Sequence, residues 1–134
     1  MILVHSLTDA QVERLYQLYQ NEWWCKGRSL KDTFLCIKGS SIIFGIIDDD
    51  ALIGFARVLT DYIFKAFIFD VIVDPAYRKR GVGKIIINAI KTHEDLQRVR
   101  HFELYCRTNM IPYYRSFGFV DNLSDISLMR YVPE

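Results

Sequence analysis

An apolar run at Ala66–Val73 is separated by only a short turn from the start of a helix, and this junction restricts the fold most strongly. The single polar residue of the run is Asp70, so the run predicts a strand buried on both faces in the middle of a sheet. Pro75 ends the strand, and from Gly81 onward the apolar residues recur at helical spacing. A buried strand that leads directly into an amphipathic helix is typical of α/β proteins.

The turn between this strand and this helix concentrates positive charge and glycine. The first amides of a helix have no acceptor within the helix, and the helix dipole adds positive charge there. Glycine has no Cβ, so an anion can lie directly against the backbone. Because the formal net charge of the chain is only +1, the cluster is local and favours a small polyanion over nucleic acid. The predicted anion site consists of Arg78, Lys79, Arg80, Gly81, Val82, Gly83 and Lys84.

The rest of the chain predicts a mixed sheet with flanking helices. Thr8 with Gln11, and Ser29 with Asp32, have the spacing of helix N-caps. A helical crossover joins Ala66–Val73 to the next strand, so these two strands should be parallel. The other predicted elements are strands at Ile2–His5, Ile42–Ile47, Leu52–Thr60 and His101–Cys106, a helix at Met110–Phe117, a strand from Phe119 onward and an edge strand at Ser127–Val132.

The length and composition of the chain set further limits. At 134 residues the chain suits one domain, predicted to span residues 1–134. No apolar run reaches the length of a membrane span and the N-terminus has no signal pattern, so we expect cytoplasmic residence and no membrane partner. Cys25, Cys36 and Cys106 lack the spacing of paired or metal-binding thiols, which predicts reduced cysteines and no metal site.

Three motifs then occur in a recognisable order. An Ile-Gly-Phe sequence lies within Leu52–Val58, the pattern Arg78-x-x-Gly81-x-Gly83 opens the predicted helix, and Tyr114-x-x-x-Gly118-Phe119 follows the last helix. Each motif alone is weakly specific, but three in register are far more specific. Across Leu52–Phe119 the chain resembles the GNAT superfamily of N-acetyltransferases.

The resemblance implies a GNAT fold: a mixed, mostly antiparallel sheet with helices on both faces and a central parallel strand pair that splays apart. It also implies acetyl-CoA as co-substrate, without a metal. The pyrophosphate would lie on the loop Arg78–Lys84, and the pantetheine arm would lie along the backbone of Val71, Ile72 and Val73. Members of this family commonly form dimers, so the resemblance also allows a homodimer.

Two side chains are the candidates for proton transfer. The resemblance places Tyr114 near the CoA sulfur, where a phenol of pKa about 10 can protonate a thiolate of pKa about 8.5. Asp70 is the first candidate base, because an unpaired carboxylate in an apolar strand would have a raised pKa. Some similar enzymes carry a glutamate where Phe69 stands, so Glu103 or a chain of waters stays open as the base.

The function that the resemblance implies is transfer of an acetyl group to a primary amine of a small molecule or peptide by direct attack. The alternative is a non-catalytic acyl-CoA-binding or regulatory module with the same fold. A P-loop nucleotide hydrolase is excluded because Ile85 follows Lys84, where a serine or threonine would bind magnesium. The sequence leaves protein N-termini, lysines, polyamines and aminoglycosides open as acceptors.

Overall fold

A computed structural model describes residues 1–133, which form two compact units. The first unit comprises Met1–Leu104, and the second begins at Tyr105. Among residues 1–133, no helix is long and apolar enough to cross a membrane. A single domain over residues 1–134 stays a prediction.

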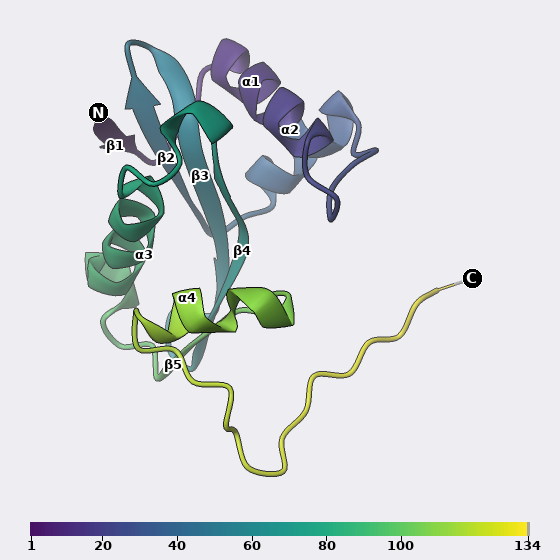
Figure 1. Ribbon diagram of the computed structural model, residues 1–134, viewed down its shortest axis with the longest axis vertical. Helices are drawn as coiled ribbons and strands as arrows, with labels where there is room; N and C mark the ends of the chain where they lie inside the picture. Colours follow the sequence, from purple (N-terminus) through teal and green to yellow (C-terminus); the bar gives the residue numbers. More distant parts are fainter. Residues whose placement is uncertain (134) are drawn as a thin grey trace. The chain divides into compact units, whose positions relative to one another are not determined.

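The first unit is built on one mixed sheet of five strands in the order β1-β2-β3-β4-β5 (Figure 1). Neighbours from β1 to β4 are antiparallel, and β4 and β5 are parallel, as the sequence predicts. The strands are β1 (Ile2–Val4), β2 (Ile42–Asp48), β3 (Ala51–Thr60), β4 (Lys65–Val73) and β5 (His101–Glu103).

Local sequence signals fix the hairpin and the helix starts. Asp49 and Asp50 both adopt left-handed φ values, 49° and 62°, which match the tight turn that joins β2 to β3. The Thr8 hydroxyl accepts from the Gln11 amide and the Gln11 side chain accepts from the Thr8 amide, so the predicted capping box is confirmed. The helices of this unit are α1 (Asp9–Gln20), α2 (Leu30–Lys38) and α3 (Val82–Thr92), with short 3-10 helices η1 (Pro75–Tyr77) and η2 (Glu94–Leu96).

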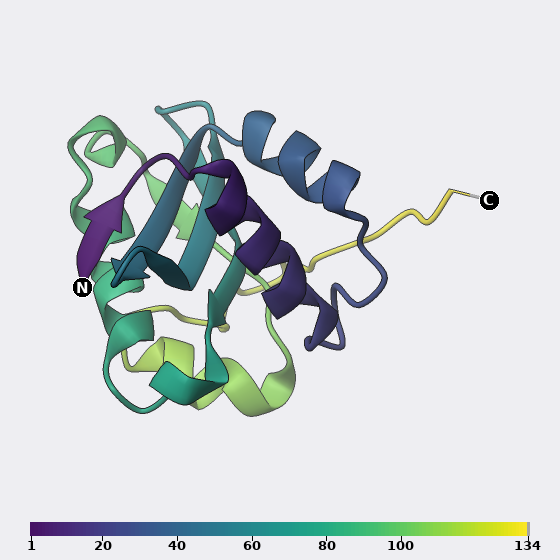
Figure 2. The same ribbon diagram turned by 90° about the horizontal axis from the view of Figure 1, so that it is seen from above.

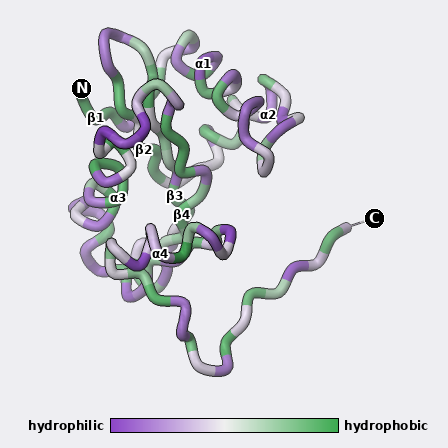
Figure 3. Tube along the Cα trace, viewed as in Figure 1, coloured by the Kyte–Doolittle hydropathy of each residue, from purple (hydrophilic) through white to green (hydrophobic). Residues whose placement is uncertain are grey.

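Helices cover both faces of this sheet, with α1 and α2 on one side and α3 on the other (Figure 2). The core beneath α1 joins Leu15 and Tyr19 to Phe55 and Ile72 of the sheet. The hydrophobic stretches of the central strands run through this core (Figure 3). On the opposite face α3 lies so close to β3 that a Cβ on Gly54 would be 2.7 Å from Val82 Cγ1. The fold thus places the N-terminus of α3 directly against the central sheet.

The structure corrects two predictions about the parallel pair. The strand β4 is not buried on both faces, since Phe67 and Phe69 are only partly buried. The strand β5 ends at Glu103 rather than Cys106, and its ladder to β4 covers only Lys65–Phe67. Beyond that ladder the outer edge of β4 has no partner strand among residues 1–133.

The second unit contains η3 (Thr108–Met110) and α4 (Ile111–Arg115), which together match most of the predicted helix. Gly118 then takes a left-handed φ of 94° after the helix. The strands predicted from Phe119 onward and at Ser127–Val132 are wrong, because residues 119–133 contain no strand. The large apolar side chains from Val120 onward are exposed, up to 90% for Met129. A strand pattern forms a strand only where a neighbouring strand supplies the hydrogen bonds.

Candidate functional site

A bulge in β4 organises the site in the first unit. Phe69 pairs with Arg57 and Ile72 pairs with Phe55, so Asp70 and Val71 together lie opposite the single residue between these partners on β3. Asp70 adopts a left-handed φ of 59°, which is rare for a residue other than glycine. The bulge turns the Asp70 side chain toward α1 and the loop between α1 and α2.

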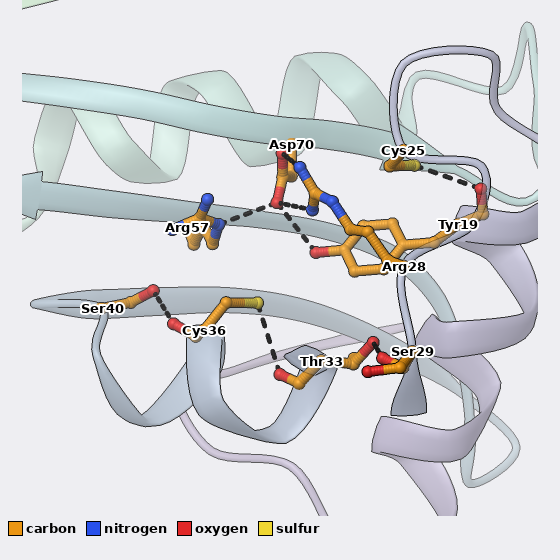
Figure 4. Close-up of polar contacts among 9 residues, drawn as sticks. All are labelled: Tyr19, Cys25, Arg28, Ser29, Thr33, Cys36, Ser40, Arg57 and Asp70. Atoms are coloured by element: carbon orange, nitrogen blue, oxygen red, sulfur yellow. Dashed lines mark hydrogen bonds and ion pairs between the residues drawn. The ribbon is translucent and has the colours of Figure 1, made fainter. Parts of the chain in front are cut away.

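Three side chains from three parts of the chain converge on the Asp70 carboxylate (Figure 4). Arg28 donates from both terminal nitrogens, at 2.6 Å to Oδ2 and 3.2 Å to Oδ1. Arg57 Nε donates to Oδ2 at 2.7 Å, and the Tyr19 hydroxyl donates to the same oxygen at 3.0 Å. The carboxylate is 5% exposed, so it is a nearly buried anion that bridges α1, the α1–α2 loop, β3 and β4.

The pairing reverses the expected protonation of Asp70. Burial raises the pKa of this carboxyl, but hydrogen bonds and positive charge from Arg28 and Arg57 outweigh burial and hold the pKa below its usual value. The prediction of a raised pKa assumed an unpaired carboxylate and is wrong. Burial also raises the pKa of the Tyr19 hydroxyl, so this group stays a neutral donor to Asp70.

Aromatic rings surround the two arginines. The Arg28 guanidinium lies 4.8 Å from the Tyr19 ring centroid and 5.7 Å from that of Trp24, and the Arg57 guanidinium lies 5.0 Å from that of Phe69. Trp24, one of two tryptophans in the α1–α2 loop, packs partly buried against the core. Stacking of Arg28 on Tyr19 therefore attaches the loop to α1, and its ion pair with Asp70 attaches the loop to the sheet.

The predicted anion site lies at the start of α3. The first hydrogen bond of the helix runs from the Ile85 amide to the Gly81 carbonyl, so the amides of Val82, Gly83 and Lys84 have no acceptor within the helix. Within the described part of the chain, no side chain caps this end. Gly81 has a left-handed φ of 80°, and a Cβ built on it would meet no atom within 4 Å. The helix end is thus open toward an anion.

The basic side chains of this loop differ in the partners that they contact. Arg78 donates from Nη2 to Glu22 at 2.8 Å and from Nε to the Val73 carbonyl at 3.3 Å, so it ties the end of β4 to the α1–α2 loop. Arg80 stacks on the Tyr77 ring at 4.8 Å. Lys79 and Lys84 are exposed, whereas Gly83 is buried in the helix face that packs on the sheet. Val71 and Val73 are partly buried and Ile72 is buried.

Tyr114 belongs to the second unit, in α4, where its ring packs edge-to-face on Tyr113 and Phe119. Burial is the main cause that raises the pKa of its hydroxyl, and the ionisable Tyr113 and Cys106 add to the effect. Tyr114 therefore stays protonated at neutral pH, as a proton donor must.

The structure also shows the surroundings of Glu103 and of the three cysteines. Glu103 pairs with Lys65 at the start of the parallel ladder. All three cysteines are free thiols, of which Cys25 is buried, Cys36 is partly buried and Cys106 is exposed. Among residues 1–133, no group of three or more histidine, cysteine or acidic side chains is placed to hold a metal ion.

Sequence reasoning missed Tyr19, Arg28 and Arg57. One signal was present: Arg57 stands within the apolar run of β3, on the hairpin neighbour of the strand that contains Asp70. A charged residue in an apolar strand needs a partner of opposite charge. Tyr19 and Arg28 gave no comparable signal, because their partner lies 51 and 42 residues away.

Comparison with known proteins identifies the family of the chain. The acetyltransferase (GNAT) family model matches residues 10–119. The N-acetyltransferase ycf52 of Pyropia yezoensis is 30% identical over 98% of this chain and 78% of its own length. The histone acetyltransferase TAP1 of Glycine max is 36% identical over 98% of this chain and 62% of its own length.

Solved structures share the fold. A GNAT-family structure from Xanthomonas campestris pv. campestris has a TM-score of 0.82 and 33% identity, over 99% of this chain and 95% of that one. The complex of AAC(6')-Iy with a CoA bisubstrate analogue has a TM-score of 0.73 at 18% identity, over 98% of each chain. The chain therefore belongs to the GNAT family of acetyltransferases and is an acyltransferase.

Proposed function

We propose that this protein transfers the acetyl group of acetyl-CoA to a primary amine by direct attack of the amine on the thioester. The observation that carries the proposal is the open edge of β4 beyond Phe67, which leads through η1 to the uncapped N-terminus of α3. An extended arm with amide groups suits the first part, and a pyrophosphate suits the second.

The residues present fit acetyl-CoA as a substrate. Backbone groups of Val71, Ile72 and Val73 belong to the part of β4 beyond its ladder with β5, which has no partner strand among residues 1–133, and in our proposal they hold the pantetheine arm. The amides of Val82, Gly83 and Lys84, with the open space at Gly81, would receive the pyrophosphate, and the exposed Lys79, Arg80 and Lys84 would add charge. Arg78 acts differently, because it is already bound to Glu22 and Val73.

The protonation states of Tyr114 and of the two carboxylates suggest which groups transfer protons. Tyr114 keeps its proton and is our proposed donor to the departing thiolate. Both candidate carboxylates are ion-paired: Asp70 with two arginines, and Glu103 with Lys65. Asp70, whose pKa is lowered by its arginine partners, is a weak base, and Glu103 is already bound by Lys65. We therefore assign removal of the amine proton to water, the third possibility that the sequence leaves open.

The first test is thermal unfolding with acetyl-CoA. A ligand at 100 times its dissociation constant stabilises the folded state by about 2.7 kcal/mol, which gives a measurable rise in Tm. Release of the CoA thiol with a panel of primary amines then tests the transfer itself. Stabilisation without thiol release for any amine would instead support a non-catalytic acyl-CoA-binding module.

A matched pair of variants tests the loop. Gly81 and Gly27 both have left-handed φ values, 80° and 93°, and a Cβ on either would meet no atom within 4 Å. Gly81→Ala and Gly27→Ala should therefore carry a similar backbone strain of about 1–2 kcal/mol. Only Gly81→Ala should reduce the stabilisation by acetyl-CoA. Equal stabilisation of the two variants would remove the loop from the binding site.

Cytoplasmic residence stays a prediction.

A further inference from the structure

The Arg57 guanidinium is only partly used by the protein. Its Nε donates to Asp70 and its face stacks on Phe69, but within residues 1–133 neither terminal nitrogen donates a hydrogen bond. The side chain is 15% exposed, and no buried polar side-chain atom in the described chain lacks a partner, so these nitrogens are open to solvent. A guanidinium presents two parallel donors that match the two oxygens of a carboxylate.

The charges around Arg57 do not balance. Arg28 and Arg57 pair with the same anion, Asp70, so the three side chains together carry one net positive charge. Glu22, in the same loop as Arg28, is bound by Arg78. The neighbouring Cys25 and Cys36 thiols and the Tyr19 hydroxyl all have raised pKa values, chiefly through burial, and are neutral at neutral pH. Partly buried positive charge without a counter-ion is unfavourable and attracts an anion.

Apolar rings form a wall beside this charge. Phe67 and Phe69 stack in parallel, with centroids 5.4 Å apart and an interplanar angle of 20°. Both lie on the face of β4 that carries Arg57 on the adjacent strand, just before the bulge and the strand edge assigned to the thioester arm. An anion bound here would be one part of a molecule whose other part reaches the bulge.

We propose that Arg57, held in place by Asp70, binds a carboxylate of the acceptor, and that the preferred acceptor is an amine with its own carboxylate, such as an amino acid. This proposal rests on the proposed function and names its substrate class. Arg57 would bind substrate, and Asp70 is a positioning residue that fixes the Arg57 fork through Nε. Polyamines and aminoglycosides carry additional ammonium groups, which the surplus positive charge would repel.

The experiment compares CoA-thiol release for an amino acid, for its carboxamide and for spermidine. The amino acid should have a kcat/KM about tenfold or more above that of the carboxamide, mainly through KM, since the carboxamide cannot form the charge-assisted bidentate contact with the guanidinium. Arg57→Gln should bring this ratio toward one. Arg57→Lys keeps the charge but loses the fork, and should give an intermediate ratio. Arg98→Gln, an exposed control, should leave the ratio unchanged.

Each result supports or overturns the proposal. Equal kcat/KM for amino acid and carboxamide, a preference for spermidine, or a ratio insensitive to Arg57→Gln would overturn it. If no amine releases thiol, the proposed function fails, and calorimetry of the amino acid on the folded protein decides the subsite alone. Binding that is lost in both Arg57 variants supports the subsite, and binding that both retain overturns it.

Discussion

Gly54 should be the position where the smallest added side chain disturbs the fold most. A Cβ there would lie 2.7 Å from Val82 Cγ1 and 3.1 Å from Ile86 Cδ1. Carbon atoms in contact prefer about 3.5–4.0 Å, so α3 and β3 would have to separate by roughly 1 Å at this point. Overpacking of this kind costs about 1–3 kcal/mol. For a chain of this length that corresponds to a fall in Tm of about 4–12 °C.

The assay is thermal and urea unfolding of Gly54→Ala beside Gly39→Ala. At Gly39 the nearest atom to an added Cβ is the Leu35 carbonyl oxygen at 3.4 Å, and φ is −82°. Alanine fits there and restricts the unfolded chain, so Gly39→Ala should be neutral or stabilising by up to about 1 kcal/mol. The two variants should thus differ in the sign of their effect or in its size by several degrees.

A double variant tests the cause. Val82→Ala removes the methyl group that the new Cβ would meet, so Gly54→Ala should cost less in the Val82→Ala background than in the natural chain. Gly54→Ala with unchanged stability, or with a cost that is the same in both backgrounds, would refute the close packing of α3 on β3. Because Val82 begins α3, the same displacement should weaken stabilisation by acetyl-CoA.

Three further predictions concern single groups. Tyr114→Phe should lower turnover with little change in acetyl-CoA affinity, and unchanged turnover would exclude Tyr114 as the proton donor. Asp70 has a lowered pKa, so its contribution to stability is present at neutral pH and is lost as pH falls below the ordinary carboxyl value of 3.8 through the folded pKa. The difference in unfolding free energy between the natural chain and Asp70→Asn should therefore be largest near pH 7, about 2–4 kcal/mol, and should shrink in acid; a constant difference would contradict the ion pairing. Thr8→Ala should destabilise by about 1 kcal/mol in urea unfolding, since the α1 capping box is lost, whereas an exposed Ser→Ala change away from helix ends should have almost no effect.

Local signals in the sequence predicted most of the first unit correctly. The caps at Thr8 and Ser29 involve side chains only three residues from the amides they bind, and the Asp49–Asp50 turn is equally local. Such features depend little on the rest of the fold. The N-terminus of α3 followed in the same way from Pro75 and Gly81.

The predictions that failed all depend on neighbours distant in sequence. Strand pattern alone placed strands in residues 119–133, but a strand also needs a partner that the pattern does not specify. Asp70 was predicted to be unpaired because no local pattern aligns Arg28 and Tyr19 with it. The bulge that brings them together requires a left-handed aspartate, a conformation that tertiary contacts have to stabilise.

The Asp70 cluster also has a consequence for the order of folding. Its hydrogen bonds join residues 13, 42 and 51 positions apart, so only the contact with Arg57 can form within the β3–β4 hairpin. Contacts across long loops form late, because the entropy of loop closure has to be overcome first. Removal of the Tyr19 hydroxyl or the Arg28 guanidinium should then accelerate unfolding while refolding keeps its rate. The lifetime of the folded state would thus be set by the same anion that positions Arg57.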